Sequence, residues 1–178
     1  LSRNACWLQK MLGLSEADRK GLRSLTQKYA RIKQLIFARW AMVMFHFERA
    51  LYADPQQDLN TLWWRLKEKY QLLNLSEKRY KPDWAAKIHF TIAPCYYHNY
   101  LLGELLASQI THYLVKQVLA AGEPCSESLI GQKEVGRFFK EKIFYPGKTL
   151  TWNEMIFQAT GEYLTPKYYV RQFVEASV

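Results

Sequence analysis

A long run of apolar residues at helical spacing constrains this sequence more than any other feature. From Leu22 onward, an apolar side chain recurs every three or four positions as far as Tyr52, and that spacing places the side chains on one face of an α-helix. The hydroxyl of Ser15, followed by acidic residues, predicts where the helix begins. Pro55 predicts where it ends, because proline lacks the N–H that continues a helix. A helix of this length predicts either a bend or two helices placed end to end.

Further helices are expected wherever an apolar stripe or a capping signal is followed by glycine or proline. The expected ranges are 58–73, 98–120, 131–146, 151–161 and 166 onward, with a loop over 74–83. The last helix is expected to carry Pro166 at its first position. No alternating strand pattern, linker or internal repeat interrupts this order. The predicted fold is therefore all-α, with residues 1–178 forming a single helical domain or a fragment of one.

The composition fits a folded helical protein. Hydrophobic residues make up 49% of the chain, enough for a sizeable core and too many for a disordered chain. No segment is apolar enough to cross a membrane, and Arg39 interrupts the best candidate, so no membrane partner is expected. Three cysteines cannot build a disulfide framework. We expect Cys6, Cys95 and Cys125 to be small buried residues, and their scarcity favours the cytoplasm.

The chain is basic, with 25 Lys and Arg against 16 Asp and Glu, a formal charge of +9. Several of these cations, including Arg19, Arg23 and Arg31, fall on one side of the first long helix, and such a side can follow the phosphates of a nucleic acid. The aromatic residues, however, stand at core spacing and are not interleaved with the cations as a base-stacking surface requires. We therefore interpret the basic side as solvated, or as facing a missing partner segment, and do not expect nucleic acid as a partner.

The sequence contains no self-contained catalytic motif. There is no HExxH, and the nearest imitation, His46 and Glu48, places its two polar side chains on different sides of a helix. No cysteine pair has the spacing of a zinc site, and neither a glycine-rich phosphate loop nor a GxSxG elbow occurs. The chain alone is therefore expected to bind no catalytic zinc.

Polar and aromatic residues are densest between Lys87 and Tyr100. A lysine offers a point cation to a carboxylate. Histidine and tyrosine can donate hydrogen bonds to a carbonyl that is becoming an oxyanion. Tyr97 and Tyr100 are three residues apart and would share one face of a helix. The cluster therefore has the chemistry to hold a peptide, although an aromatic core cluster with an exposed Lys87 would give the same pattern.

Eight short motifs, in order and spacing, resemble the C-terminal part of a known enzyme family. They are Phe47-Glu48-Arg49-Ala50-Leu51-Tyr52, Trp63-Trp64-Arg65-Leu66, Lys69-Tyr70-Gln71, Lys87-x-His89, Tyr97-x-x-Tyr100, Lys133-Glu134-x-Gly136, Trp152-Asn153-Glu154-Met155 and Thr160-Gly161. The family is that of the zinc metallopeptidases similar to angiotensin-converting enzyme, which are peptidyl-dipeptidases. The bacterial branch is the most similar, and the oligoendopeptidases come next. The resemblance implies a gluzincin-type helical peptidase that hydrolyses peptides.

The resemblance also implies a role for each residue of the cluster. Lys87 would bind the C-terminal carboxylate of the peptide, with Tyr97 assisting. His89 would hydrogen-bond a substrate carbonyl near the scissile bond, and Tyr100 would donate to the oxyanion. The gap between His89 and the tyrosine pair is one residue longer than in the animal enzymes, so Tyr96 is an alternative to Tyr97.

Two departures from the family pattern limit these expectations. Asn99 stands where chloride-activated relatives carry arginine, which argues against chloride dependence. The zinc motif is absent, so the resemblance implies that zinc belongs to the intact parent and is held by an N-terminal half that precedes Leu1. This portion would then be inactive alone. The alternative is a non-catalytic helical module that binds peptides, proteins or nucleic acid.

Overall fold

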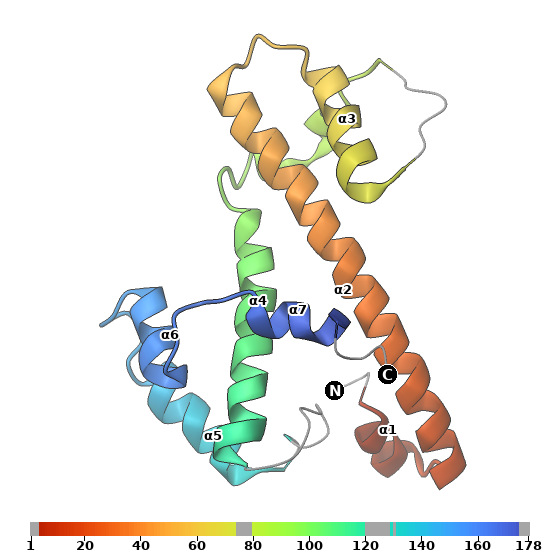
Figure 1. The fold of residues 1–178 in the computed structure, drawn as a ribbon, viewed down its shortest axis with the longest axis vertical. Helices are drawn as coiled ribbons and strands as arrows, with labels where there is room; N and C mark the ends of the chain where they lie inside the picture. Colours follow the sequence, from red (N-terminus) through yellow and green to blue (C-terminus); the bar gives the residue numbers. More distant parts are fainter. Residues whose placement is uncertain (1–3, 74–79, 120–128, 130, 175–178) are drawn as a thin grey trace. The chain divides into compact units, whose positions relative to one another are not determined.

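The computed structural model describes residues 4–73, 80–119, 129 and 131–174, and within them every regular element is helical (Figure 1). This confirms the predicted all-α class. The α-helices are α1 (Ala5–Leu12), α2 (Glu16–Ala53), α3 (Leu59–Gln71), α4 (His98–Tyr113), α5 (Lys133–Phe138), α6 (Trp152–Thr160) and α7 (Lys167–Val174). The 3-10 turns η1 (Asp83–Ala86) and η2 (Ile88–Phe90) and the π-helical turns η3 (Leu114–Val118) and η5 (Phe139–Phe144) lie between them.

The chain divides into two compact units. The first consists of residues 1–31 and 104–178, and the second of residues 32–103. The helices α2 and α4 each begin in one unit and end in the other. Each unit has a hydrophobic core of its own. The single domain predicted for residues 1–178 stays a prediction.

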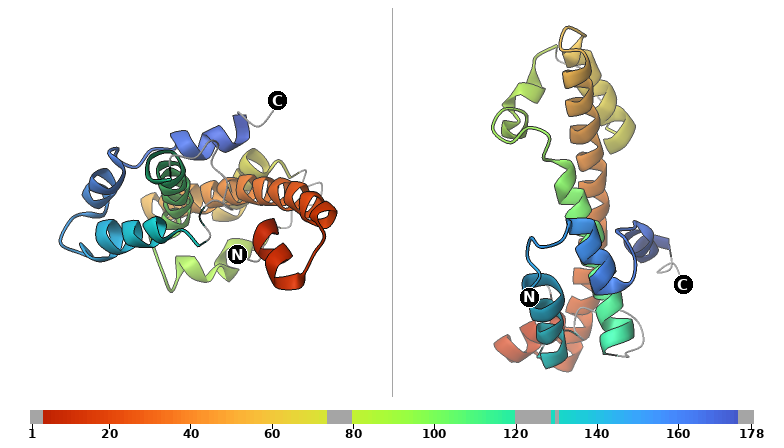
Figure 2. Two further views of the ribbon diagram at one scale, coloured as in Figure 1. Left: turned by 90° about the horizontal axis from the view of Figure 1, so that it is seen from below. Right: turned by 90° about the vertical axis from the view of Figure 1, so that its left-hand side faces the viewer.

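Helix α2 is one unbroken helix of 38 residues (Figure 2). The predicted division into two helices placed end to end is therefore wrong. The reason is that residues 16–53 contain no proline, so nothing interrupts the backbone hydrogen bonds from one turn to the next. As predicted, Ser15 caps the start, where its hydroxyl accepts a hydrogen bond from the N–H of Asp18 at 3.1 Å. The helix ends two residues before Pro55.

Aromatic side chains dominate the core of the second unit. Phe47 and Trp63, from α2 and α3, are almost completely buried and meet edge to face, with ring centroids 5.1 Å apart. Phe90, from η2, packs on Phe47 at the same distance. The indole N–H of Trp84 donates to the side chain of Asn60 at 3.0 Å and ties η1 to α3. This core fixes the segment after residue 83 against the paired helices α2 and α3.

The core of the first unit lies where α4 and its extension η3 meet α5 and α6, with Leu114 at its centre. Helix α6 begins with the predicted capping box of Thr151 and Glu154 and ends at Gly161, whose φ of 81° is easily adopted only without a side chain. The helix predicted at 98–120 changes to a π-helical turn at Leu114. Pro166 was predicted inside the last helix, but α7 begins one residue later.

The surroundings of the cysteines differ from those predicted. The cysteines were expected to be buried, but Cys95 is exposed and Cys6 is only half-buried, because Cys95 lies in a surface turn and not on the inner face of a helix. Cys125, the helix end expected near residue 120 and most of the loop at 74–83 lie outside the described residues. Among the residues described, no helix is long and apolar enough to cross a membrane.

Candidate functional site

The predicted site residues lie together in the second unit, on the segment that joins η1 to α4. Lys87 separates the turns η1 and η2, and its N–H donates to the carbonyl of Trp84 at 3.0 Å. His89 lies within η2. Pro94 prevents a continuous helix across this segment. Tyr97 and Tyr100 stand at the start of α4, where the N–H of Tyr100 donates to the carbonyl of Tyr97 at 3.2 Å.

The rings of three predicted residues contact one another. The imidazole of His89 lies edge-on to the ring of Tyr97 at 4.8 Å and to the ring of Tyr100 at 5.9 Å, measured between centroids. The two tyrosine rings are 5.1 Å apart, which confirms that Tyr97 and Tyr100 share one face. The segment after η1 therefore brings one imidazole and two phenols to the same place.

The two alternative tyrosines differ in their surroundings. Tyr97 is 8% exposed, and its hydroxyl oxygen accepts a hydrogen bond from the indole N–H of Trp40 at 2.7 Å. Burial raises the pKa of Tyr97, and the hydrogen bond from Trp40 opposes that rise. Tyr96 is 48% exposed and lies edge-on to the ring of Tyr100, at 5.7 Å. Of the two alternatives, Tyr97 is the one whose ring contacts His89.

Trp40 of α2 belongs to this cluster, although its spacing predicts only a core residue. Besides its hydrogen bond to Tyr97, its ring lies under the ammonium of Lys87, with Nζ 5.4 Å from the ring centroid. Such a cation–π contact favours the charged lysine. Trp40 therefore connects Lys87 with Tyr97. Nothing in the sequence indicates this, because Trp40 and Tyr97 are 57 residues apart.

A buried carboxylate fixes the turn that precedes Tyr97. Glu48 is 5% exposed, and its Oε1 accepts a hydrogen bond from the backbone N–H of Cys95 at 2.6 Å. Cys95 has a φ of 56°, in the left-handed region that residues with a side chain seldom occupy. His46, which with Glu48 forms the imperfect imitation of a zinc motif, stacks flat on Tyr70 instead, with ring centroids 5.1 Å apart. His46 and Glu48 thus face different partners, as predicted.

Two lysine charges lie in and beside the cluster. Burial lowers the pKa of Lys67 and the charge of Lys87 lowers it further, whereas the charge of Asp83 opposes this shift. Lys67 also lies over the ring of Trp64, 4.4 Å from the centroid. With the hydrogen-bond donors of His89 and the tyrosines, this charge suits an anion or an oxyanion.

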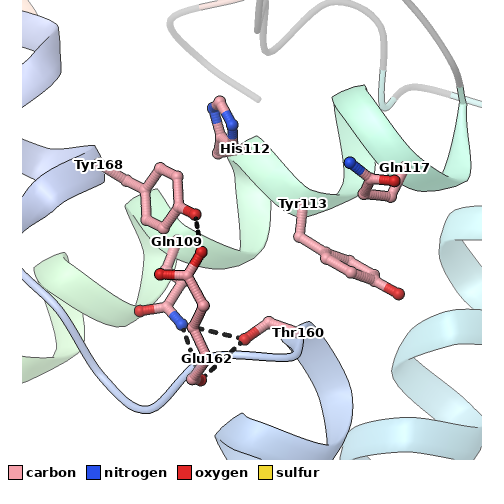
Figure 3. Close-up of a pocket in the computed structure, with 7 residues that line it drawn as sticks. All are labelled: Gln109, His112, Tyr113, Gln117, Thr160, Glu162 and Tyr168. Carbon is pink, nitrogen blue, oxygen red and sulfur yellow. Dashed lines mark hydrogen bonds between the residues drawn. The ribbon is translucent and has the colours of Figure 1, made fainter.

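A hollow in the first unit, separate from this cluster, has a volume of about 320 Å³ (Figure 3). Its centre is the buried Gln109 of α4, whose Nε2 donates to Oγ1 of Thr160 at 2.9 Å and to the carbonyl of Glu162 at 3.1 Å. The Oε1 of Gln109 accepts from the N–H of Thr165 at 3.1 Å. The hollow is lined by Gln109, His112, Tyr113, Gln117, Thr160, Glu162 and Tyr168.

The polar groups of this hollow largely bind one another. The hydroxyl of Tyr168 donates to Glu162 at 2.6 Å, and Lys167 lies 3.6 Å from the same carboxylate oxygen. The hydrogen bond from Tyr168 is the main reason why the pKa of Glu162 is lowered. We interpret these hydrogen bonds as structural, because they hold residues 160–168 against α4. Nothing in the sequence marks Gln109 as buried, because a single glutamine in an apolar stripe carries no such signal.

Within the described ranges, no group of three or more His, Cys, Asp or Glu side chains could hold a metal ion. No family model matches the chain, and neither the curated proteins nor the solved structures give a match.

Proposed function

We propose that this chain is the C-terminal, substrate-binding portion of a zinc-dependent, gluzincin-type peptidase of the peptidyl-dipeptidase kind. The observation that supports the proposal is the meeting of Lys87, His89, Tyr97 and Tyr100 in one cluster. The family resemblance gives these same four residues a role in binding a peptide. That resemblance rests on the sequence alone and uses no information on where the residues lie in space.

The proposed roles follow from the chemistry of each group. Lys87 attracts the C-terminal carboxylate of a peptide, and the hydroxyl of Tyr97 donates a hydrogen bond to the same group. His89 donates to a peptide carbonyl. Tyr100, which is 45% exposed, donates to the oxygen that becomes negative when the carbonyl is attacked. A bond that forms mainly in the transition state increases the rate more than it increases substrate binding.

The described residues do not fit a catalytic zinc ion, since they contain no group of three metal ligands. A zinc ion in the intact enzyme would activate a water molecule and would take its ligands from polypeptide outside these residues. We therefore assign this chain only binding and orientation of the peptide and stabilisation of the oxyanion.

The first test is a titration of the 178-residue chain with N-acetyl-dialanine and with its C-terminal amide, followed by NMR. We expect the free acid to bind at least about tenfold more tightly than the amide, because a hydrogen-bonded charge pair is worth more than 1.4 kcal/mol. Lys87→Met should abolish this difference. The matched control is Lys69→Met, because Lys69 also lies over an aromatic ring, that of Tyr70, but is not part of the cluster.

Two results would contradict the proposal. One is equal binding of acid and amide by the unmodified chain. The other is an unchanged preference for the acid in Lys87→Met, which would mean that the general positive charge of the chain attracts the carboxylate. If neither peptide binds but an oligonucleotide does, with an affinity that falls steeply with salt, the chain is a nucleic-acid-binding module instead.

A further inference from the structure

The hydrogen bond between Trp40 and Tyr97 has a direction that matters for ligand binding. An indole N–H can only donate, so the hydroxyl oxygen of Tyr97 must accept. The hydroxyl hydrogen of Tyr97 is then left to donate elsewhere. Within the described part of the chain, Trp40 is the hydrogen-bond partner of this hydroxyl. The Tyr97 hydroxyl is therefore held in place by Trp40 while it keeps a hydrogen to donate to a ligand.

The same indole also holds the cation of the cluster. The ammonium of Lys87 lies over the ring of Trp40, 5.4 Å from its centroid. A lysine side chain has four rotatable bonds, and a contact of this kind reduces the number of places its charge can occupy. Trp40 thus contacts both groups that are proposed to bind a carboxylate.

The position of Trp40 is itself fixed by its helix and by the core of the second unit. It stands on α2 next to Ala41, which is 1% exposed, and it meets the ring of the buried Trp63 edge to face at 5.8 Å. Its ring also contacts the ring of Tyr97 edge to face, at 6.4 Å. A side chain fixed by helix, core and hydrogen bond can hold its neighbours in a set arrangement.

We propose that Trp40 is a positioning residue that turns Tyr97 and Lys87 into a preformed receptor for a peptide carboxylate. This inference rests on the proposed function. Trp40 contributes no charge and donates no bond to the peptide. It fixes the direction of the Tyr97 hydroxyl and the place of the Lys87 ammonium, so that neither group has to be ordered when the ligand arrives.

The test compares Trp40→Phe with Trp64→Phe in the titration with N-acetyl-dialanine and its amide. Trp40→Phe keeps an aromatic ring under Lys87 but removes the N–H. Trp64 is the matched control, because it also lies under a lysine, Lys67, in the same unit. We expect the affinity for the acid to fall about three- to tenfold in Trp40→Phe, the effect of one lost hydrogen bond, and to change less than about twofold in Trp64→Phe. The affinity for the amide should not change in either variant.

A double-mutant cycle shows whether Trp40 acts through Tyr97. In a Tyr97→Phe background, Trp40→Phe should weaken acid binding no more than about twofold, because the bond is already lost. The indole ¹⁵N–H signal of Trp40, assigned by its loss in Trp40→Phe, should shift in Tyr97→Phe and stay in place in Trp64→Phe. This signal reports the hydrogen bond without any ligand, and a variant that fails to fold is recognised by collapse of the whole spectrum.

The outcomes separate this inference from the function on which it rests. If the unmodified chain prefers the acid and Trp40→Phe prefers it equally, the inference is wrong and the proposed function stands. The inference is also wrong if Trp64→Phe causes the same loss of affinity for the acid. It is equally wrong if Trp40→Phe has its full effect in the Tyr97→Phe background. Equal binding of acid and amide by the unmodified chain refutes the proposed function, and with it this inference.

Discussion

The bond between the carboxylate of Glu48 and the backbone of Cys95 should be a main support of the candidate site. The carboxylate is 5% exposed and accepts from the N–H at 2.6 Å. A hydrogen bond to a charged group contributes about 1.5 to 3 kcal/mol, and this one is part-buried. We therefore expect Glu48→Ala to lower the free energy of unfolding by about 2 to 3 kcal/mol. Glu48→Gln keeps the volume and an acceptor oxygen, and should cost only about 1 kcal/mol.

The assay is urea denaturation followed by tryptophan fluorescence, which samples the second unit through Trp40, Trp63, Trp64 and Trp84. The matched control is Asp54→Asn, because Asp54 also accepts from a backbone N–H, that of Gln56 at 3.0 Å, but is exposed. Its effect should stay below about 0.5 kcal/mol. If Glu48→Ala destabilises the chain no more than Asp54→Asn, the reasoning is refuted.

The turn itself offers an independent check on the same argument. Cys95 has a φ of 56° and an exposed side chain, so its side chain contributes strain and little packing. A left-handed residue with a side chain costs about 1 kcal/mol more than glycine. We therefore expect Cys95→Gly to be more stable than Cys95→Ala by about 1 kcal/mol. The opposite order would mean that the turn is not strained at Cys95.

Two further predictions concern the first unit. Gln109→Leu should lower the free energy of unfolding by about 3 kcal/mol, since it removes the four hydrogen bonds of a side chain that is 1% exposed. Gln117→Leu, at an exposed position of the same hollow, should have almost no effect in urea denaturation. Because the fold lowers the pKa of Glu162, this carboxylate stabilises the chain above its unfolded pKa of 4.5, and the contribution is lost as pH falls through the lowered folded value. The stability difference between the unmodified chain and Glu162→Gln should therefore shrink below pH 4 in urea midpoints measured from pH 7 to pH 3; a constant difference would contradict this.

The sequence predicted those features that depend on neighbouring residues. The ends of α2 and α6 follow from Ser15, Pro55 and the capping box at 151–154, each of which acts within one helical turn. The predicted cluster was found for the same reason, because its residues lie within one short segment. The exposure of Cys95 and the π-helical turns could not be predicted, because a turn's place on the surface and the exact period of a helix depend on tertiary packing.

Trp40 and Glu48 were missed for a different reason. Their partners, Tyr97 and Cys95, are 57 and 47 residues away in the chain. Neither spacing is a recognisable signal, and each residue has an adequate local explanation. Trp40 continues an apolar stripe, and Glu48 is a polar residue near the end of a helix. Only the packing of the second unit shows that both side chains point towards the same segment.

The places of these two residues on α2 explain how one helix can organise the candidate site. Trp40, Met44 and Glu48 are spaced by four residues each, so their side chains project from the same side of α2. Met44 is fully buried, and the two residues that flank it each hold one part of the segment from 87 to 100 by a hydrogen bond. Met44 belongs to the same core cluster as Phe90 and Tyr97 of the segment, and the two hydrogen bonds fix the position of the segment along the helix. The proposed peptide receptor, built from one loop and one helix start, can therefore be rigid, because its reference points are positions on a single continuous helix.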